Sequence, residues 1–429
     1  MTAEKRGCVY WAPLFHFYQP PTQRHSVLRQ IVAECYRPLV RLFLDRPNAH
    51  ATFNINAVLT EMLDEHGYGD VLEGLRELGR QGRVEFTGSA KYHAILPLIP
   101  AEEQRRQMRL NLETNRRLLG EAYAPQGLFP PEMCYGPEML ESAESTGHRW
   151  IILSGVASSG AWPMNVVDQV QAHDGRLSVF FRDDVLSNLV SFRKTDAPDF
   201  LRRLRDLGNY HPGDVYVVTA QDAETFGHHI KDWEVDFLGW VFQELAALLN
   251  GLSSEEEPGG QPENGKPIRV VTISQLLERF PAGPVVEPHP SSWSTSADDL
   301  KAGDPYPLWS APGNRLHALL WEHLELVVAL TNAAQALAVK QEGRLLYKEA
   351  RATLDEALHS DQFWWASRRP MWNADMVHRG IMLQQGALVL AYNAIEASDA
   401  PAARKRELYH KVLLARGLRA QIEDLLLAK

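Results

Sequence analysis

The sequence predicts an α/β protein, an irregular β/α barrel followed by a C-terminal α-helical bundle. Over roughly the first 285 residues, short apolar runs alternate with longer stretches of helical periodicity. This alternation is typical of βαβ units and a parallel sheet. It recurs seven or eight times, which favours closure of the sheet into a barrel. From about residue 314 onward, the apolar residues recur at helical spacing instead.

Eight short apolar runs are predicted to be strands. They span residues 8–15, 51–55, 84–87, 127–129, 150–153, 177–181, 215–220 and 268–273. The helices predicted between them include residues 27–43, 71–81, 101–119 and 198–207. The helix at 101–119 follows a proline and carries Glu102 and Glu103 in its first turn, where the helix dipole favours negative charge.

The rest of the chain is predicted to be loop and then helix. Residues 253–266 are charged and rich in glycine and proline, so we expect an exposed loop. Residues 281–312 are rich in proline and show no clear periodicity. Two helical stripes follow, made by Leu316, Leu320, Leu324 and Val327 and by Leu408, Val412, Leu418, Ile422 and Leu425. We therefore divide the chain into a barrel domain, residues 1–285, and a loop region with a helical bundle, residues 286–429.

Composition narrows the class of partner and the compartment. The 44 basic and 54 acidic residues give a formal net charge of −10, which argues against nucleic acid or an anionic membrane as the main partner. A neutral carbohydrate suits such a surface, although charge alone does not select it. Residues 1–21 lack the features of a signal peptide, and no run approaches the roughly 18 apolar residues of a membrane span. Three cysteines without metal-like spacing fit a reducing compartment, so we expect a cytoplasmic protein without a cofactor and leave its oligomeric state open.

Polar and aromatic side chains collect at the carboxyl ends of the predicted strands, where βα barrels carry their reactive groups. Glu132 follows two prolines, which fix the backbone into a stiff bend at the end of the fourth strand. Asp222 directly follows the strand at 215–220. Other strand ends contribute His16, Tyr18, Gln19, Glu85, Tyr92, His93, Glu224, His228 and His229.

Two carboxylates at two strand ends, 222 − 132 = 90 residues apart, meet the requirement of glycoside hydrolysis. One carboxylate must be ionised to attack the anomeric carbon, and the other must be protonated to donate to the leaving oxygen. Their environments must therefore separate their pKa values. Several aromatic residues near the predicted mouth of the barrel either stack on sugar rings or pack in the core: Phe129, Tyr135, Phe226, Trp293, Tyr306 and Trp309.

Five segments stand in order along the chain: HFYQPP at 16–21, GRVEFTG at 82–88, FPPEMCYGP at 129–137, QDAETFGHH at 221–229 and SSWSTSADDLKAGDPYPLW at 291–309. They resemble the sequence motifs of glycoside hydrolase family 57, a family of retaining enzymes that act on α-glucans. The segment DQFWWAS at 361–367 is similar to one in the helical C-terminal region of that family. The resemblance covers roughly residues 8–367.

This resemblance implies an incomplete (β/α)7 barrel followed by a helical bundle that completes the active-site cleft, and an α-glucan or maltooligosaccharide substrate. Glu132 would be the nucleophile and Asp222 the acid/base. His16, Glu85 and Asp304 would line the −1 subsite with His228 adjacent. The further substrate-binding candidates are Gln19, His93, Phe129, Tyr135, Glu224, Phe226, Trp293 and Trp309.

The chain departs from the family pattern at Phe129, Pro130 and Ala223, and Phe17-Tyr18 is inserted in the first motif. Because neither carboxylate changes, we expect activity to be retained, while acceptor and chain-length specificity stay open, as does the choice between hydrolysis, transfer and branching. Two alternatives remain. One is a zinc-dependent deacetylase or mannosidase-like enzyme using His16, His93, Asp222, His228 and His229. The other is a non-catalytic glucan-binding relative.

Overall fold

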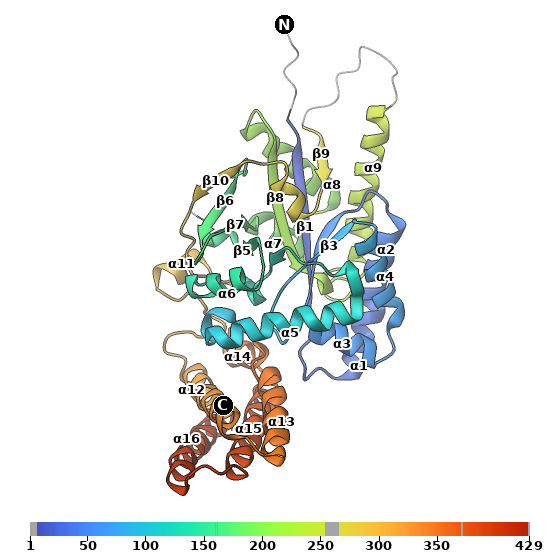
Figure 1. Cartoon of the computed structure of the whole chain (residues 1–429). Helices are drawn as coiled ribbons and strands as arrows, with labels where there is room; N and C mark the ends of the chain where they lie inside the picture. Colours follow the sequence, from blue (N-terminus) through green and yellow to red (C-terminus); the bar gives the residue numbers. More distant parts are fainter. Residues whose placement is uncertain (1–6, 159, 161, 254–265, 370–371, 428–429) are drawn as a thin grey trace. The chain divides into compact units, whose positions relative to one another are not determined.

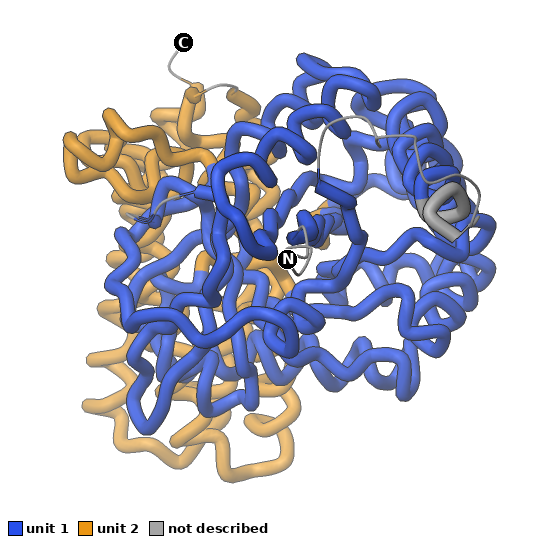
Figure 2. The backbone as a smooth tube through the Cα atoms, turned by 90° about the horizontal axis from the view of Figure 1, so that it is seen from above, with its two compact units in different colours: residues 1–19, 23–91, 96–293 blue, residues 20–22, 92–95, 294–429 orange. Residues whose placement is uncertain are grey.

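The structure is a computed structural model that describes residues 7–158, 160, 162–253, 266–369 and 372–427. The chain divides into two compact units (Figure 2). Unit 1 comprises residues 1–19, 23–91 and 96–293, and unit 2 comprises residues 20–22, 92–95 and 294–429. Each unit is described separately below.

One sheet of unit 1 is parallel throughout and is built around β1 (Val9–Phe17), which is buried along its whole length. Its order is β3 (Val84–Thr87), β2 (Ala51–Ile55), β1 and β8 (Val215–Asp222). A short fifth strand, β9 (Ile268–Val270), pairs with the first residues of β1. Because a strand that is buried on both faces needs apolar residues on both, β1 is apolar at every position except His16.

The second sheet has the order β10 (Ala282–Val285), β6 (Val167–Gln171), β7 (Arg176–Phe181), β5 (Trp150–Leu153) and β4 (Gly127–Leu128). Only the β6–β7 pair among these strands is antiparallel. Two isolated parallel bridges, Gly88 with Leu128 and Arg182 with Val218, connect this sheet to the first one. Unit 1 is therefore a mixed α/β structure dominated by parallel strands.

The predicted strands are all present, and those at 51–55, 84–87 and 150–153 have the predicted bounds. The first strand extends two residues further, to Phe17, and β8 extends through Asp222. The sequence reading missed β6 and β10. The residues of β6, VDQVQ, are largely polar, and β10 is AGPV, whose proline is tolerated at a sheet edge.

Helices flank the strands of unit 1 (Figure 1). The predicted helix at 27–43 is observed as α1 (His25–Ile31) and α2 (Arg37–Asp45), which are joined by a π-helical turn at Val32–Tyr36. The predicted helix at 101–119 is α5 (Ala101–Leu119), with the expected bounds. The remaining helices are α3 (Ala57–Glu65), α4 (Gly69–Arg80), α6 (Leu140–Ser145), α7 (Asp184–Ser191), α8 (Ala197–Leu207), α9 (Trp240–Ser253) and α10 (Ile273–Leu277).

Aromatic side chains fix the central strands against the helices. Phe15 on β1, Phe53 on β2 and Phe43 on α2 are fully buried and meet edge to face, with ring centroids 5.2–5.8 Å apart. On the same strand, Trp11 packs against Phe200 of α8 at 5.1 Å. Since each such pair adds about 1 kcal/mol to the burial of its area, β1 is a rigid support for the residues at its carboxyl end.

Unit 2 is helical. Its helices are α11 (Ala297–Lys301), α12 (Arg315–Leu337), α13 (Gln341–Ala357), α14 (Asp361–Ala366), α15 (Ala374–Glu396) and α16 (Ala402–Leu427). Helix α12 packs against α15 and α16, and α13 packs against α15 (Figure 1). The two predicted apolar stripes lie on α12 and α16 and are buried, except that Leu425 is half-buried.

Two further sequence expectations concern loops and membranes. Residues 254–265, most of the loop predicted at 253–266, lie outside the described residues. None of the described helices has an apolar stretch long enough to cross a bilayer.

Candidate active site

The site is organised around His16, near the carboxyl end of β1. In the parallel register, His16 lies opposite Asn54 of β2 on one side and opposite Asp222 of β8 on the other. The Nδ1 atom of His16 lies 2.6 Å from Oδ1 of Asn54, and Nδ2 of Asn54 donates to Oγ1 of Thr87 on β3 at 2.9 Å. Because the Asn54 oxygen faces the ring, the His16 Nδ1–H is the donor in this contact. A polar ladder thus crosses the ends of three strands.

Aromatic rings surround the His16 side chain. Phe129 stacks on it with ring centroids 4.8 Å apart and an interplanar angle of 13°. Trp293 meets both rings edge to face at 5.8 Å, and Tyr18 lies 6.1 Å from His16 in a stacked orientation. Residues that are far apart in the sequence, near 16, 129 and 293, therefore form one wall.

Glu132 lies on the turn that follows β4 and is half-buried. Its backbone has a φ of 60°, in the left-handed region, which costs an ordinary residue about 1–2 kcal/mol. The Nε1–H of Trp293 donates to Oε2 of Glu132 at 2.7 Å, and the Trp293 backbone N–H donates to the Glu132 carbonyl at 3.0 Å. An antiparallel bridge between Tyr135 and Ser291 holds the two segments together. These contacts fix the carboxylate of Glu132 relative to the aromatic wall.

Asp222 is the last residue of β8 and is half-buried. Burial raises the pKa of its carboxyl group from 3.8 to about 6, and the positive charge of Arg182 partly opposes this shift. A raised pKa suits the acid/base role that the family resemblance implies for Asp222, because such a group must hold a proton before it donates one. A carboxyl group with this pKa can hold a proton in mildly acidic solution and release it near neutrality.

Arg182 is a residue of the site that the sequence reasoning missed. It follows β7 directly, is buried, and donates through Nε to the Ala220 carbonyl of β8 at 2.9 Å. Its guanidinium also donates to Asp184 at 2.7 Å and to Asn188 at 2.9 Å. The guanidinium carbon lies 5.8 Å from the centre of the Trp293 ring. Arg182 therefore links the strand that carries Asp222 to the tryptophan that holds Glu132.

Glu224 lies two residues after Asp222 and is buried in a hydrogen-bonded cluster. Gln19 donates to its Oε1 at 3.0 Å, and the hydroxyl of Tyr36 donates to the same oxygen. Burial, together with the charge of Asp222, raises the pKa of Glu224 to about 8. Glu224 is therefore mostly neutral at pH 7, which limits the negative charge beside Asp222.

Glu85 lies on β3 and is hydrogen-bonded to β2 and to the first turn of α10. It lies two residues before Thr87 on the same face of β3, and so one layer further from the strand ends. Its Oε1 accepts hydrogen bonds from Thr52 at 2.8 Å and from the Ser274 backbone N–H at 2.9 Å, and burial raises its pKa. These contacts tie β3 to the amino end of α10.

The other predicted residues of unit 1 have these surroundings. The ring of Phe226 is buried against Phe15 at 5.2 Å, which gives it a packing role. His228 is half-buried, and its Nδ1 lies 2.6 Å from a carboxylate oxygen of Glu34. Tyr135 is buried, which raises the pKa of its hydroxyl to about 12.

Three predicted substrate-binding residues belong to unit 2. His93 is fully buried, with its Nδ1 2.8 Å from the Ser360 hydroxyl. Asp304 is half-buried, and burial raises its pKa. Trp309 is fully buried, and its carbonyl accepts a hydrogen bond from Trp321 at 2.9 Å. Across the part of the chain that the structure describes, no group of three or more histidine, cysteine, aspartate or glutamate side chains is arranged to hold a metal ion.

The fold and the site define an α/β protein whose parallel strands end in two carboxylates, a histidine and a wall of aromatic rings. Comparison with known families gives the more particular assignment. The chain belongs to glycosyl hydrolase family 57, whose sequence model matches residues 12–281.

The sequence identity between this chain and individual relatives is low. The chain is 25% identical over 302 residues to an alpha-amylase of Pyrococcus abyssi and 24% identical over 302 residues to a 4-alpha-glucanotransferase of Thermococcus litoralis. Each alignment covers 67% of this chain and 42% of the relative, so the chain spans less than half the length of these proteins. The crystal structure of a branching enzyme from Pyrococcus horikoshii superimposes with a TM-score of 0.67 over 94% of both chains, at 15% identity. At that identity the similarity shows the fold alone.

Proposed function

We propose that this protein is a retaining enzyme that cleaves α-1,4-glucans and passes the glycosyl unit to water or to another sugar. Three contacts support the proposal: Asp222 pairs with His16 across β8 and β1, the His16 ring packs against Trp293, and the Trp293 N–H donates to Glu132. Paired carboxylates of different pKa are what glycoside cleavage needs. The names of the relatives, alpha-amylase and 4-alpha-glucanotransferase, support an α-glucan as the substrate.

The scaffold we propose is an irregular seven-stranded barrel in the order β1, β2, β3, β4, β5, β7 and β8. The support for it is the pair of bridges that connects the two sheets, Gly88 with Leu128 and Arg182 with Val218. In such a ring the carboxyl ends of β4 and β8 face the same mouth, where enzymes of this architecture carry their reactive groups. The barrel domain, residues 1–285 in the sequence-based division, then carries both reacting carboxyl groups.

In the first step, the carboxylate of Glu132 attacks the anomeric carbon while Asp222 donates its proton to the glycosidic oxygen. The C–O bond to the leaving sugar breaks, and a covalent glycosyl-enzyme ester forms. In the second step, Asp222 takes a proton from a water molecule or an acceptor hydroxyl, whose oxygen displaces Glu132 from the anomeric carbon. Two inversions give net retention.

The surrounding residues suit these roles. The hydrogen bond from Trp293 orients the attacking carboxylate. The raised pKa of Asp222 lets it carry a proton before the first step. The neutral state of Glu224 at pH 7 keeps a second charge away from Asp222 when the proton is transferred.

The experiment that tests the proposal is product analysis with maltoheptaose and amylose. We expect Glu132→Gln and Asp222→Asn each to lower kcat at least about a thousandfold. Glu138→Gln, which changes an exposed carboxylate shortly after Glu132, is the matched control and should leave kcat unchanged. New reducing ends indicate hydrolysis, redistributed chain lengths indicate transfer, and new α-1,6 links indicate branching.

Proton NMR of the first product should show the α-anomer, and a first-formed β-anomer would refute the retaining mechanism. Full activity of both carboxylate variants would refute the assignment of roles. Exhaustive chelation separates the zinc-dependent alternative from this proposal, since the carboxylate mechanism needs no metal ion.

A further inference from the structure

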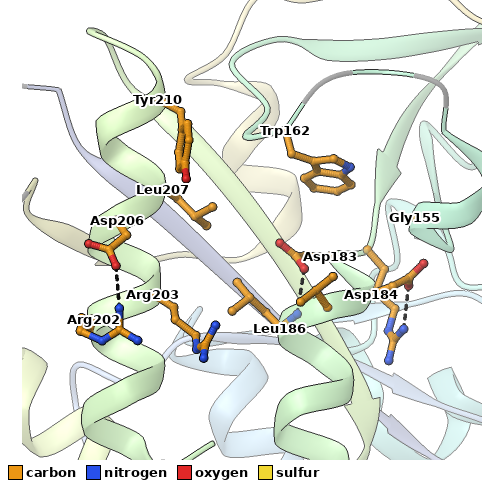
Figure 3. A pocket seen from close by; sticks show the side chains of 12 residues that line it. Gly155, Trp162, Asp183, Asp184, Leu186, Arg202, Arg203, Asp206, Leu207 and Tyr210 are labelled. Atoms are coloured by element: carbon orange, nitrogen blue, oxygen red, sulfur yellow. Dashed lines mark hydrogen bonds and ion pairs between the residues drawn. The ribbon is translucent and has the colours of Figure 1, made fainter.

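Unit 1 has a pocket of about 450 Å³ between α7 and α8 (Figure 3). Trp162, Tyr210, Asp183 and Leu186 are among its lining residues. A second pocket, of about 390 Å³, also has Trp162 and Tyr210 in its lining, so the two pockets share these aromatic side chains. Both volumes are in the range of small-molecule sites. Neither Glu132 nor Asp222 lines either pocket.

The pockets occur where the strand pairing of unit 1 is interrupted. Strands β7 and β8 belong to different sheets and are joined by the isolated bridge between Arg182 and Val218. Nearer the amino end of β8, Tyr216 pairs instead with Met164 in an antiparallel bridge, and its N–H donates to the Met164 carbonyl at 2.8 Å. Trp162 lies two residues before Met164, so this bridge also holds Trp162 near the amino end of β8.

The aromatic side chains are placed to receive a ligand. Tyr210 is 76% exposed, although exposed apolar area costs free energy, and Trp162 is half-buried. Figure 3 shows the two rings on opposite sides of the pocket, with the carboxylate of Asp183 below Trp162. The Oδ1 atom of Asp183 accepts the Leu186 N–H at the start of α7, and burial raises the pKa of this carboxyl group.

The charges around the first pocket are balanced within the protein. Arg202 donates to Asp206 at 2.9 Å, Arg203 donates to Asp199 at 2.7 Å, and Arg182 donates to Asp184 at 2.7 Å. Because each of these guanidinium groups already has a carboxylate partner, the pocket is poorly suited to a phosphate or another anion. Aromatic faces combined with hydrogen-bonding carboxylates suit a neutral polyhydroxylated ligand, whose C–H faces stack and whose hydroxyls donate.

We propose that these two pockets form a second, non-catalytic site for an α-glucan chain. The glucan rests on Tyr210 and Trp162 and donates hydroxyl hydrogen bonds to Asp183 in the first pocket and to Asp168 in the second. The choice of an α-glucan rests on the proposed function. The site would keep a long polymer on the enzyme between successive reactions.

The test uses protein carrying Glu132→Gln, in which turnover is blocked, and titrates it calorimetrically with maltoheptaose. Two classes of site are expected. Adding Tyr210→Ala should weaken one class about three- to tenfold, as expected for the loss of one stacked ring, and should reduce retention in an amylose-containing gel. Tyr210→Phe should keep both classes. Phe192→Ala, which removes another exposed aromatic ring of unit 1 outside both pockets, should leave binding unchanged. Because Tyr210 is largely exposed, its replacement should not disturb folding, and thermal melting checks this.

Turnover by the wild-type enzyme, together with a single class of maltoheptaose site that Tyr210→Ala does not alter, would overturn this inference and leave the proposed function standing. Loss of one binding class in the Tyr210→Ala variant of a protein that never turns over glucan would support the site and overturn the proposed function. Absence of both binding and turnover would overturn both.

Discussion

The raised pKa of Asp222 makes a quantitative prediction about activity. A shift from 3.8 to about 6 corresponds to roughly 3 kcal/mol in favour of the protonated form. At pH 7 about a tenth of the enzyme then has Asp222 protonated, which is about a hundredfold more than for an ordinary aspartate. We therefore expect kcat/KM to fall about tenfold for each pH unit above pH 6, as the general acid is lost.

The assay compares two substrates across pH 4.5–9. With a maltooligosaccharide, whose leaving group needs a proton, kcat/KM should begin to fall near pH 6, and this fall is the basic limb of the pH profile. With the corresponding glycosyl fluoride, whose leaving group needs little help, the limb should weaken, and Asp222→Asn should retain much more activity than it does on the maltooligosaccharide. A limb that persists unchanged in the residual activity of Asp222→Asn, or one that lies above pH 8, would refute the assignment of this pKa to the acid.

Three further predictions follow from neighbouring contacts. Arg182→Gln removes a positive charge beside Asp222, so the basic limb of the pH profile should move to higher pH. The free energy of unfolding should fall by about 3 kcal/mol because a buried ion pair is broken. The pH profile and urea unfolding measure these two effects, and a basic limb that does not move would contradict the electrostatic role of Arg182. The pKa of Glu224 is raised from 4.5 to about 8 in the folded state, so its contribution to stability is present below pH 4.5 and is lost as the pH rises through 8. Glu224→Gln should therefore be more stable than wild type in urea unfolding at pH 9, by on the order of 5 kcal/mol, with a smaller difference at pH 6. Trp293→Phe keeps an aromatic ring but removes the N–H that donates to Glu132, so we expect kcat to fall about 10- to 100-fold with KM little changed, and a normal kcat would show that the hydrogen bond does not orient the nucleophile.

Local sequence patterns predicted most of the parallel strands because a strand buried on both faces is a continuous apolar run between turn residues. Strand β5, WIIL, was predicted with its observed bounds for this reason. The π-helical turn at Val32–Tyr36 left no such signal, since its apolar spacing stays close to that of an α-helix. The polar strand β6 was missed because half-exposed positions remove the apolar run.

Parts of the site followed from listing the polar residues after each strand, and parts did not. The same rule, extended to the strand at 177–181, would have found Arg182 as the next residue. No local pattern could place Trp293 on Glu132, because that hydrogen bond joins residues 161 positions apart. The motif that contains Glu85 likewise gave no sign that its carboxylate accepts a hydrogen bond from the first turn of α10.

The positive φ of Glu132 indicates that the orientation of its carboxylate is set during folding. An unfolded chain seldom visits that backbone region at a glutamate, so the conformation must be imposed by tertiary contacts. Here these are the two hydrogen bonds from Trp293 to Glu132 and the nearby bridge between Tyr135 and Ser291. The carboxylate that we propose as the nucleophile is therefore held in place before any sugar binds. Glycine at this position would remove the backbone strain, and we expect it to give a more stable protein without activity. The strain at Glu132 thus lowers the stability of the folded chain in exchange for a fixed carboxylate.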